Sequence, residues 1–372
     1  MIETISNTSS LTTRLRERIK SEGAITFCDW MKAALYDPDD GYYCRPDRSR
    51  WGREGDYRTS PERTSLFAAS FARYFAKLYH QLGEPSEWTI VEAGAGEGQF
   101  AEALLQTLQE FFPDVFKATR YMIDEISLPS GTMARDRLRP FADRVHFRKL
   151  ADIEIDPGVV FANELLDAFP VHRLTMQEGE LKEFYVTVGE HGTFEWRLAA
   201  PHRSLTPRFE AYFEEFGVSL AEGQVAEVSL EIEEWLRTVA VSLRTGYVIT
   251  VDYGAESEDL YSSAANQEGT LRGFRRHQFV DNLLAQPGEH DLTTTVNWSF
   301  VKSAGRRWGF ELVEFERQDR FLLSCGLLKQ LQVETSRAAS ESERLRLTSG
   351  AREMIFPDGM AASFQVLVQK KT

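Results

Sequence analysis

The feature that most constrains this chain is a glycine-rich turn between a predicted strand and a predicted helix. Residues 88–91 form a short apolar run, residues 92–98 have the sequence EAGAGEG, and the amphipathic stretch 100–112 follows. Glycine is favoured where a strand turns tightly into a helix and a ligand approaches the backbone, because a Cβ atom would be in the way. The first amides of the helix then face the ligand. The sequence therefore predicts an α/β fold that binds a nucleotide-like ligand at this turn.

The glycine spacing distinguishes two classes of nucleotide site. Dinucleotide-binding dehydrogenases use Gly-x-Gly-x-x-Gly, whereas Gly94, Gly96 and Gly98 occupy every second position and Glu92 precedes them. An acid followed by Gly-x-Gly-x-Gly resembles the loop of class I methyltransferases, in which the loop wraps the methionyl end of S-adenosylmethionine. We therefore expect S-adenosylmethionine as the cofactor, and a nicotinamide-dependent oxidoreductase is the weaker alternative.

Two acidic residues end the next predicted strand, 121–123. An acid at this position can accept hydrogen bonds from both ribose hydroxyls of a bound nucleoside. Asp124 and Glu125 point to opposite faces of a strand, so only one of them is expected to bind the ribose. Together with the glycine loop, this acid favours a methyl-donor site.

Predicted strands and helices alternate along most of the chain, which implies a mostly parallel sheet with helices on both faces. Residues 171–198 differ, because they alternate with period two and are broken by EGE and EHG, which is typical of antiparallel hairpins inserted in the sheet order. The predicted fold class is α/β, a class I methyltransferase (Rossmann-like) core with an N-terminal helical region and inserted hairpins. Helices are predicted at 11–20, 25–36, 65–82, 100–112, 132–141, 230–243 and 298–308, and strands at 88–91, 121–123, 145–147, 159–162, 247–251, 311–316 and 363–368.

No linker rich in Pro, Gly or Ser separates autonomous domains, so the predicted divisions are regions of one large fold. Residues 1–84 form the N-terminal helical region and a lid, and 85–170 form the first part of the cofactor-binding core. Residues 171–229 form an inserted substrate region. Residues 230–372 complete the core and carry late loops on the substrate side.

Net charge and composition limit the kinds of partner and location that we expect for this chain. The formal net charge is −14, and a chain this acidic repels a phosphate backbone, so no nucleic-acid partner is expected. No apolar run reaches the roughly 18 residues that span a bilayer, and residues 1–6 lack the basic start and apolar core of a signal peptide. We therefore expect a cytoplasmic protein without membrane insertion. The 3 cysteines include no CxxC pair and no histidine spacing suggests a metal, so no metal site is predicted.

Polar residues follow the predicted strand 159–162, at the edge where open α/β sheets bind ligands. Asn163 or Glu164 is expected to line the cofactor pocket, and Asp167 or Glu164 to orient the acceptor. A guanidinium acceptor must be held and must finally lose a proton, and paired carboxylates suit this through bidentate contacts. Alternatively, Asp167 caps the following turn and Glu164 is a surface acid.

Further candidates lie in three other segments. Thr59-Ser60-Pro61 either caps the long helix after it or forms a lid over the cofactor. Asp252 and Tyr253 end a predicted strand and either line the acceptor side or have structural roles. His277 lies in a late loop and is a catalytic candidate, although a lone histidine is more often structural.

Longer segments resemble one particular group, the MidA-like family of methyltransferases, which includes a mitochondrial complex I assembly factor and bacterial homologues. The resemblance spans nearly the whole chain, and the motifs occur in the family's order. The matching segments are ITFCDWMKAALYDPDDGYY (Ile25 to Tyr43), GDYRTSPE (Gly55 to Glu62), EAGAGEGQF (Glu92 to Phe100), DEIS (Asp124 to Ser127), ANELLDAFPVH (Ala162 to His172), VDYG (Val251 to Gly254), GTLRGFRRH (Gly269 to His277), PGEHDLT (Pro287 to Thr293) and GMAASFQVL (Gly359 to Leu367).

The resemblance implies a class I methyltransferase with an added helical and hairpin region, in which Glu125 is the ribose acid. The characterised mitochondrial branch methylates a protein arginine during respiratory complex assembly. The expected partners are therefore a protein substrate, such as a respiratory-complex subunit, and a second copy of the chain in a homodimer.

Three positions depart from the family pattern. Glu97 stands where the family often has arginine, Asn297 replaces a late acidic residue, and Ala68 replaces a glycine. The first change affects the cofactor loop, and the second affects the acceptor side. They are the reason to retain an alternative function, an S-adenosylmethionine-binding assembly or scaffold protein with little turnover.

Overall fold

The computed structural model describes residues 10–45, 65–276, 278–356 and 363–372, and its centre is an eight-stranded sheet. The main strand order is β15-β16-β10-β5-β2-β3-β4, with β14 paired to the end of β10. The five strands from β10 to β4 are parallel, and β16 is antiparallel to both neighbours. The strands are β2 (Trp88–Ala93), β3 (Thr119–Asp124), β4 (Val145–Phe147), β5 (Gly158–Asn163), β10 (Gly246–Ala255), β14 (Val296–Asn297), β15 (Glu311–Arg317) and β16 (Phe364–Lys371).

The strand order reverses between β2 and β5. The chain builds outward from β2 through β3 to β4 and then returns to place β5 on the other side of β2. Ligands of open α/β sheets bind at the carboxyl ends of the strands at such a reversal. The topology therefore places the expected site where the glycine loop after β2 meets the segment after β5.

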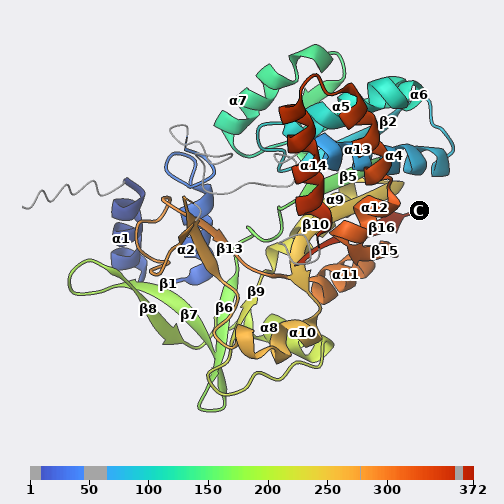
Figure 1. Cartoon of the computed structure of the whole chain (residues 1–372). Coiled ribbons are helices and arrows are strands. Elements are labelled where there is room, and N and C mark those ends of the chain that lie inside the picture. Colours follow the sequence, from blue (N-terminus) through green and yellow to red (C-terminus); the bar gives the residue numbers. More distant parts are fainter. Residues whose placement is uncertain (1–9, 46–64, 277, 357–362) are drawn as a thin grey trace, which may run out of the picture.

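Helices cover both faces of this sheet (Figure 1). One face carries α4 (Ser65–Gln81), α5 (Gln99–Phe111), α12 (Gln318–Ser324), α13 (Leu327–Arg337) and α14 (Glu341–Ile355). The other face carries α9 (Glu231–Ser242) and α11 (Trp298–Arg307). The chain also forms α6 (Pro113–Ala118), α7 (Leu128–Arg137) and α10 (Ser257–Ser262).

An aromatic stripe on α4 supplies much of the core. Its residues recur every three or four positions, as expected for the buried face of a helix, and Phe71 meets Phe161 of β5 at a ring-centroid distance of 5.0 Å. Phe161 in turn stacks on Phe100 of α5 at 4.3 Å. The stripe comprises Phe67, Phe71, Tyr74, Phe75 and Tyr79, all of them buried.

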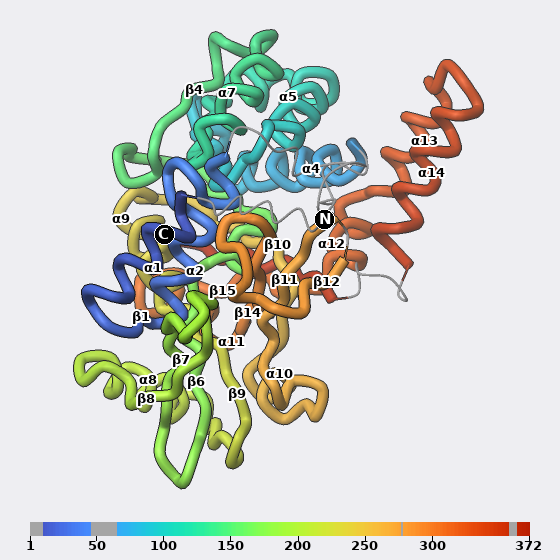
Figure 2. Tube along the Cα trace, turned by 90° about the vertical axis from the view of Figure 1, so that its left-hand side faces the viewer, coloured from blue at the N-terminus to red at the C-terminus, as the bar shows by residue number. Residues whose placement is uncertain are grey.

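The predicted hairpins form a sheet of their own. They follow β5 in the chain as expected, but they do not enter the order of the main sheet, because β1 and β9 border them in a separate antiparallel sheet, β1-β7-β6-β9, with β8 paired to β7. Figures 1 and 2 show this sheet on one side of the core. Its strands are β1 (Ile25–Thr26), β6 (His172–Gln177), β7 (Glu180–Val188), β8 (Phe194–Ala199) and β9 (Val225–Val228).

The N-terminal helices pack onto this second sheet. Buried residues of α1 (Ser10–Glu22) and α2 (Phe27–Tyr36) form one apolar cluster with Val186 of β7 and Leu292 of β13. On the sheet's other side, α8 (Thr206–Glu215) packs with β6 and β9. A third, small sheet contains β11 (Arg272–Arg275), β12 (Gln278–Phe279) and β13 (Asp291–Thr293). In the parts of the chain that the structure describes, no helix is both long and apolar enough to span a bilayer.

Three C-terminal helices, α12 to α14, were not predicted. In Figure 2, α13 and α14 extend together away from the core. Within α14 only Gly350, Ala351 and Met354 are buried. A helix that is polar on most sides lacks the apolar stripe on which a periodicity argument depends.

Two facing glycines, the first residues of β5 and β10, give a test of the parallel core. Gly158 of β5 is paired in register with Gly246 of β10, and a Cβ atom on Gly158 would lie 2.2 Å from the carbonyl oxygen of Thr89. We expect Gly158→Ala to lower the free energy of unfolding by about 1–3 kcal/mol or more, because the neighbouring backbone must move. The control is Gly131→Ala in α7, where a Cβ atom meets nothing within 4 Å, and which should gain up to about 1 kcal/mol. Equal urea midpoints for the two variants would contradict this register.

Candidate functional site

The glycine loop is held by the residues that end β3. The amide of Gly94 donates to the carbonyl oxygen of Asp124 at 2.8 Å, and the amide of Gly96 donates to Oε2 of Glu125 at 2.7 Å. Gly94 has φ of +69°, and a Cβ atom there would lie 2.9 Å from Cδ1 of Leu165. The left-handed backbone and the close approach both require glycine.

Glu92 precedes the glycine loop, and we expected it to contact the cofactor. In the structure its side chain bridges β2 and β3. Its side chain is on the same face of β2 as Ile90, because alternate residues of a strand share a face, and it is buried. Its carboxylate accepts a hydrogen bond of 2.6 Å from the hydroxyl of Tyr121. Burial raises the pKa of Glu92 to about 8, although the bond from Tyr121 favours the charged form. Glu92 therefore braces β2 against β3 beneath the loop, and its predicted contact with a cofactor stays a prediction.

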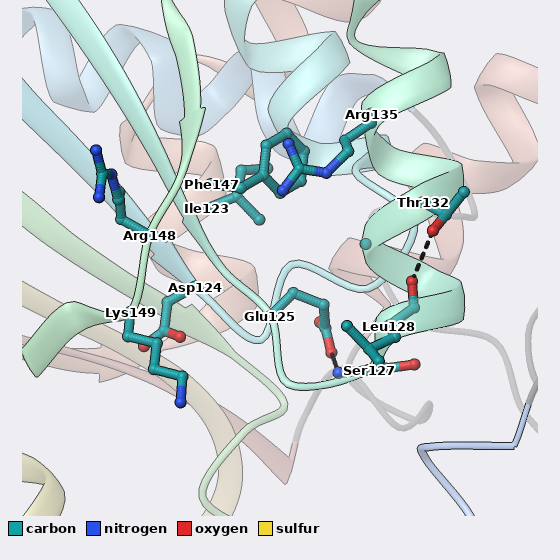
Figure 3. Close-up of a pocket in the computed structure, with 11 residues that line it drawn as sticks. Ile123, Asp124, Glu125, Ser127, Leu128, Thr132, Arg135, Phe147, Arg148 and Lys149 are labelled. Carbon is teal, nitrogen blue, oxygen red and sulfur yellow. Dashed lines mark hydrogen bonds between the residues drawn. The ribbon is translucent and has the colours of Figure 1, made fainter. Parts of the chain in front are cut away.

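A cavity of about 200 Å³ opens beside the glycine loop (Figure 3). Glu125 lies on its wall between the loop and the start of α7, where its second carboxylate oxygen accepts from the amide of Ser127 at 2.7 Å. The guanidinium carbon of Arg135 lies 3.8 Å above the ring centroid of Phe147 on another wall. The volume is below the roughly 300–1,000 Å³ of a pocket for a whole drug-sized ligand, so it suits a nucleoside portion.

The two acids after β3 have different roles. Oδ2 of Asp124 accepts from the amide of Leu150 at 3.0 Å, which ties β3 to the segment after β4. Burial raises the pKa of Asp124. Glu125 instead touches the glycine loop and the cavity, where a ribose would be held. The two acids thus have different surroundings, and the binding of ribose by one of them stays a prediction.

The segment after β5 forms the second half of the site, and we call residues 164–168 the acceptor turn. Glu164 has φ of +51°, and its amide donates to the carbonyl oxygen of Val251 at 2.8 Å. A left-handed conformation is unfavourable for a residue with a Cβ atom and is often found at functional sites. The side-chain amide of Asn163 donates to Oε1 of Glu164 at 3.1 Å. Oδ1 of Asn163 is buried and has no partner among the described residues.

Asp252, at the end of β10, organises the acceptor turn. One carboxylate oxygen accepts from the amides of Leu166 at 3.0 Å and Asp167 at 3.2 Å, and the other accepts from the amide of Tyr253 at 2.9 Å. Burial and the neighbouring carboxylates of Asp167 and Glu164 raise the pKa of Asp252, despite these hydrogen bonds. Its role in this structure is to fix the backbone that carries Asp167.

Asp167 is the buried carboxylate of the acceptor turn. It is 6% exposed. Burial and the nearby charge of Glu164 raise the pKa of Asp167 to about 7, while a hydrogen bond from Tyr253 favours its charged form. Among the residues that the structure describes, neither Asp167 nor Asp252 belongs to an ion pair. A buried carboxylate in this setting is stabilised by any cation that enters beside it.

A tyrosine of the N-terminal region, Tyr36, contacts the acceptor turn, and a second, Tyr43, stacks on it; neither was predicted. The hydroxyl of Tyr36 donates to the carbonyl oxygen of Ala168 at 2.9 Å, and the ring of Tyr43 stacks on that of Tyr36 at 5.5 Å. They belong to the segment LYDPDDGYY, which lies at the end of a predicted helix and in a family motif, without a predicted role in the site. The approach of Tyr36 to the turn depends on the packing of α2 against the second sheet, which no local pattern reveals.

Four predicted site residues fall outside the described residues. They are Thr59, Ser60, Pro61 and His277. Their proposed lid, cap and catalytic roles stay predictions. Across the residues that the structure describes, no group of three or more His, Cys, Asp or Glu side chains is arranged to hold a metal ion.

Both departures that raised doubt about activity have a structural explanation. The carboxylate of Glu97 lies 3.8 Å from Nη2 of Arg137 on α7, and Nε of Arg137 donates to the carbonyl oxygen of Glu97 at 2.9 Å. The side chain of Asn297 caps α11 by accepting from the amide of Phe300 at 3.2 Å, and it donates to the hydroxyl of Tyr212 at 2.6 Å. Asparagine and aspartate are equally good helix caps. Neither change therefore removes a group from the cavity or the acceptor turn.

The residues present fit the nucleoside and amino-acid parts of S-adenosylmethionine. The glycine loop adopts left-handed conformations at Gly94, Gly96 and Gly98, which glycine accepts readily. Glu125 offers an acceptor beside the cavity, and Oδ1 of Asn163 is a buried acceptor without a partner among the described residues. Ile123 and Leu128 make part of the cavity wall apolar, which suits a base. The acceptor turn, which carries two acids, approaches the glycine loop where Leu165 lies against Gly94.

Comparison with known proteins identifies the class that this fold and site define. Residues 70–315 match a family described as "Putative S-adenosyl-L-methionine-dependent methyltransferase". The chain is similar to a protein from Burkholderia thailandensis that was crystallised with bound S-adenosyl-homocysteine, with 28% identity, a TM-score of 0.84 and coverage of 97% of this chain and 92% of the other. The protein is therefore an S-adenosylmethionine-dependent methyltransferase, and its cofactor is S-adenosylmethionine.

The chain belongs to this methyltransferase family, which confirms the resemblance to the MidA-like group. It is 27% identical to a Drosophila melanogaster protein named "Protein arginine methyltransferase NDUFAF7 homolog, mitochondrial", over 96% of this chain and 84% of the relative. It is 25% identical to the Homo sapiens protein named "Protein arginine methyltransferase NDUFAF7, mitochondrial", over 94% and 81%. The predicted cytoplasmic location is contradicted, because these relatives are named as mitochondrial proteins.

Substitution of Gly94 tests the assignment of the glycine loop. In the unsubstituted protein, S-adenosyl-homocysteine at about 100 times its Kd should add about 2.7 kcal/mol of stability. We expect Gly94→Val to abolish the resulting rise in Tm, because the side chain meets Leu165. The control is Gly179→Val, which has a similar φ of +72° but open space around its Cβ position. A Gly94→Val protein that keeps the full ligand-induced rise would contradict the assignment.

Proposed function

We propose that this methyltransferase transfers a methyl group to an arginine side chain of a protein. The observation that carries the proposal is the buried acceptor turn, where the acids Glu164 and Asp167 follow the strand that neighbours the glycine loop. The names of the relatives, protein arginine methyltransferases, support the same acceptor. The acidic chain, with a net charge of −14, also favours a cationic substrate.

The carboxylates of the acceptor turn suit a guanidinium better than a neutral acceptor. Burial and the charge of Glu164 raise the pKa of Asp167 to about 7, so adding a cation relieves an unfavourable arrangement. A planar guanidinium can donate to carboxylates through two parallel hydrogen bonds. Such contacts orient one nitrogen and leave it free to face the methyl donor. Lysine presents a single point charge without this planar fork.

Each group of the site then has a distinct task. The bound donor supplies a methyl group on a positively charged sulfur. Glu125 and the glycine loop hold the nucleoside end, and Asn163 offers its free oxygen to a donor group nearby. Glu164 and Asp167 align the acceptor nitrogen, and alignment of this kind accounts for much of the rate of a group transfer. Asp167, with a pKa of about 7, can accept the proton that the methylated guanidinium loses.

The remaining predictions about organisation and partners extend this proposal. We propose that residues 171–229 form the substrate region, with α1 and α2 beside it, because α2 and the second sheet adjoin the acceptor turn. Within the region 1–84, α4 instead packs on the main sheet. A respiratory-complex subunit as the substrate and a homodimer stay predictions. The alternative function, a scaffold protein with little turnover, predicts that no label is transferred in the test that follows.

Labelling of a cell lysate tests the acceptor. The lysate comes from cells in which this gene is disrupted, and the purified protein is added with S-adenosylmethionine carrying a tritiated methyl group. Acid hydrolysis and chromatography should recover the label as methylated arginine. Label in lysine alone would contradict the proposed acceptor, and a lysate without label would favour the scaffold alternative. The Gly94→Val protein is the control for labelling by other enzymes.

The titration of Asp167 gives the proposal a pH dependence. Because its pKa is raised to about 7, Asp167 is neutral below that pH and charged above it, and only the charged form attracts a guanidinium. We expect kcat/KM for the acceptor to rise with pH through about 7. Asp167→Asn should flatten this rise and lower kcat/KM at least about 30-fold, since truncating a buried charge pair costs about 2–5 kcal/mol.

The matched control for this variant is Asp114→Asn. Asp114 lies in the first turn of α6, and its side chain is 89% exposed, so the same chemical change is made far from the site. This control should keep the pH profile and the rate of the unsubstituted protein. An Asp167→Asn protein with an unchanged profile would exclude Asp167 as the titrating group.

A further inference from the structure

A stacked pair of tyrosines connects the N-terminal region to the acceptor turn. Tyr36 ends α2, and Tyr43 follows a short turn after it. Their rings lie 5.5 Å apart at an interplanar angle of 28°. The hydroxyl of Tyr36 donates to the carbonyl oxygen of Ala168 at 2.9 Å, and that of Tyr43 donates to Oδ1 of Asp291 at 2.7 Å. The pair therefore joins the acceptor turn to β13.

The backbone around Asp167 is anchored at three points by three separate segments. Its amide donates to Asp252 of β10, and its carbonyl oxygen accepts from the amide of Thr294 at 2.9 Å. The third anchor is the bond from Tyr36 to the next carbonyl oxygen, that of Ala168. When the backbone is held on both sides of a residue, its side chain can adopt few orientations. A group that aligns an acceptor needs such a fixed orientation.

The electrostatic surroundings of Tyr36 include carboxylates of the site. Burial raises the pKa of Tyr36, and the charges that add to this effect include those of Asp167 on the acceptor turn and Glu125 beside the nucleoside cavity. Its hydroxyl is committed to the backbone of the turn. Tyr36 therefore contacts the acceptor turn through the backbone of Ala168.

We propose that Tyr36 is a positioning residue for methyl transfer, which fixes the direction of the Asp167 carboxylate by holding the Ala168 carbonyl group. Tyr43 keeps Tyr36 in place through ring stacking and its bond to Asp291. The inference rests on the proposed function in one respect, that Asp167 binds the acceptor. The anchoring of the turn itself does not depend on the identity of the acceptor.

The test compares Tyr36→Phe with a matched control, Tyr79→Phe. The first variant keeps the ring and its stacking and loses only the hydroxyl. Tyr79 also donates from its hydroxyl to a backbone carbonyl oxygen, that of Pro85 at 3.1 Å, but it packs on Trp88 at the opposite end of β2. Both variants therefore lose one bond of the same kind, and only one of these bonds anchors the acceptor turn.

The kinetic readout uses the gene-disrupted lysate and the tritiated donor described above. At saturating donor, Tyr36→Phe should lower the initial rate of methylarginine formation about 10- to 100-fold, because small misplacements of aligned groups are costly. The donor concentration for half-maximal rate should stay within about twofold. Rates for Tyr36→Phe and Tyr79→Phe that are equal would overturn the positioning role.

The pH profile separates positioning from a general loss of structure. The titratable groups that face Asp167 are Glu164 on its own turn, Asp252 and Tyr253 of β10, and Tyr36 of α2. A loosened turn admits water to Asp167, so the midpoint of the rate profile should fall below that of the unsubstituted protein. A destabilised but correctly anchored site would keep the original midpoint.

Amide hydrogen exchange tests whether Tyr36 anchors the acceptor turn, and it requires no acceptor. The amides of Leu166 and Asp167 both donate to Asp252, so a peptide covering residues 160–170 reports on the turn. Exchange in this peptide should be faster in Tyr36→Phe than in Tyr79→Phe or the unsubstituted protein. Unchanged exchange would overturn the inference whatever the acceptor is. If the unsubstituted protein labels no arginine but exchange does accelerate, the proposed acceptor fails and the anchoring stands.

Discussion

The arrangement of the site depends on the buried carboxylate of Asp252. It accepts hydrogen bonds from backbone amides of the acceptor turn. A buried carboxylate needs partners to offset its desolvation, and Asp252 obtains them from the amides of Leu166, Asp167 and Tyr253. These bonds join the ends of β5 and β10 and bring Leu165 against Gly94. The turn, the glycine loop and the two acids of the acceptor side are thereby held in one arrangement.

The parts predicted correctly from the sequence are those that local physics determines. The strand before Gly94 and the helix after it each follow from spacing and backbone conformation. The choice of Glu125 as the ribose acid came from the family resemblance and stays a prediction, and the structure brings Gly96 and Glu125 into a hydrogen bond. The hairpins were recognised from their period of two, but a period says nothing of the partner strand. Their pairing with β1 and β9 in a separate sheet is set by tertiary packing.

The parts that were missed depend on long-range contacts or on weak patterns. Tyr36 reaches the acceptor turn, with Tyr43 stacked on it, only because α2 packs on a sheet formed more than a hundred residues later. The bond from Tyr121 to Glu92 was also not predicted, because it depends on the pairing of β2 with β3, and the predicted contact of Glu92 with the cofactor stays a prediction. Asn297 and Glu97 looked like losses of function, and each instead makes local structural contacts.

The most direct test of the account is a crystal structure of this protein with bound S-adenosyl-homocysteine. The account predicts that the ribose hydroxyls bond to Glu125, that the base occupies the cavity beside Phe147, and that the sulfur atom lies between Gly94 and the acceptor turn, with Asp167 on the side from which an acceptor nitrogen would approach. A ligand whose sulfur points away from the acceptor turn, or whose ribose is held by groups other than Glu125, would contradict it.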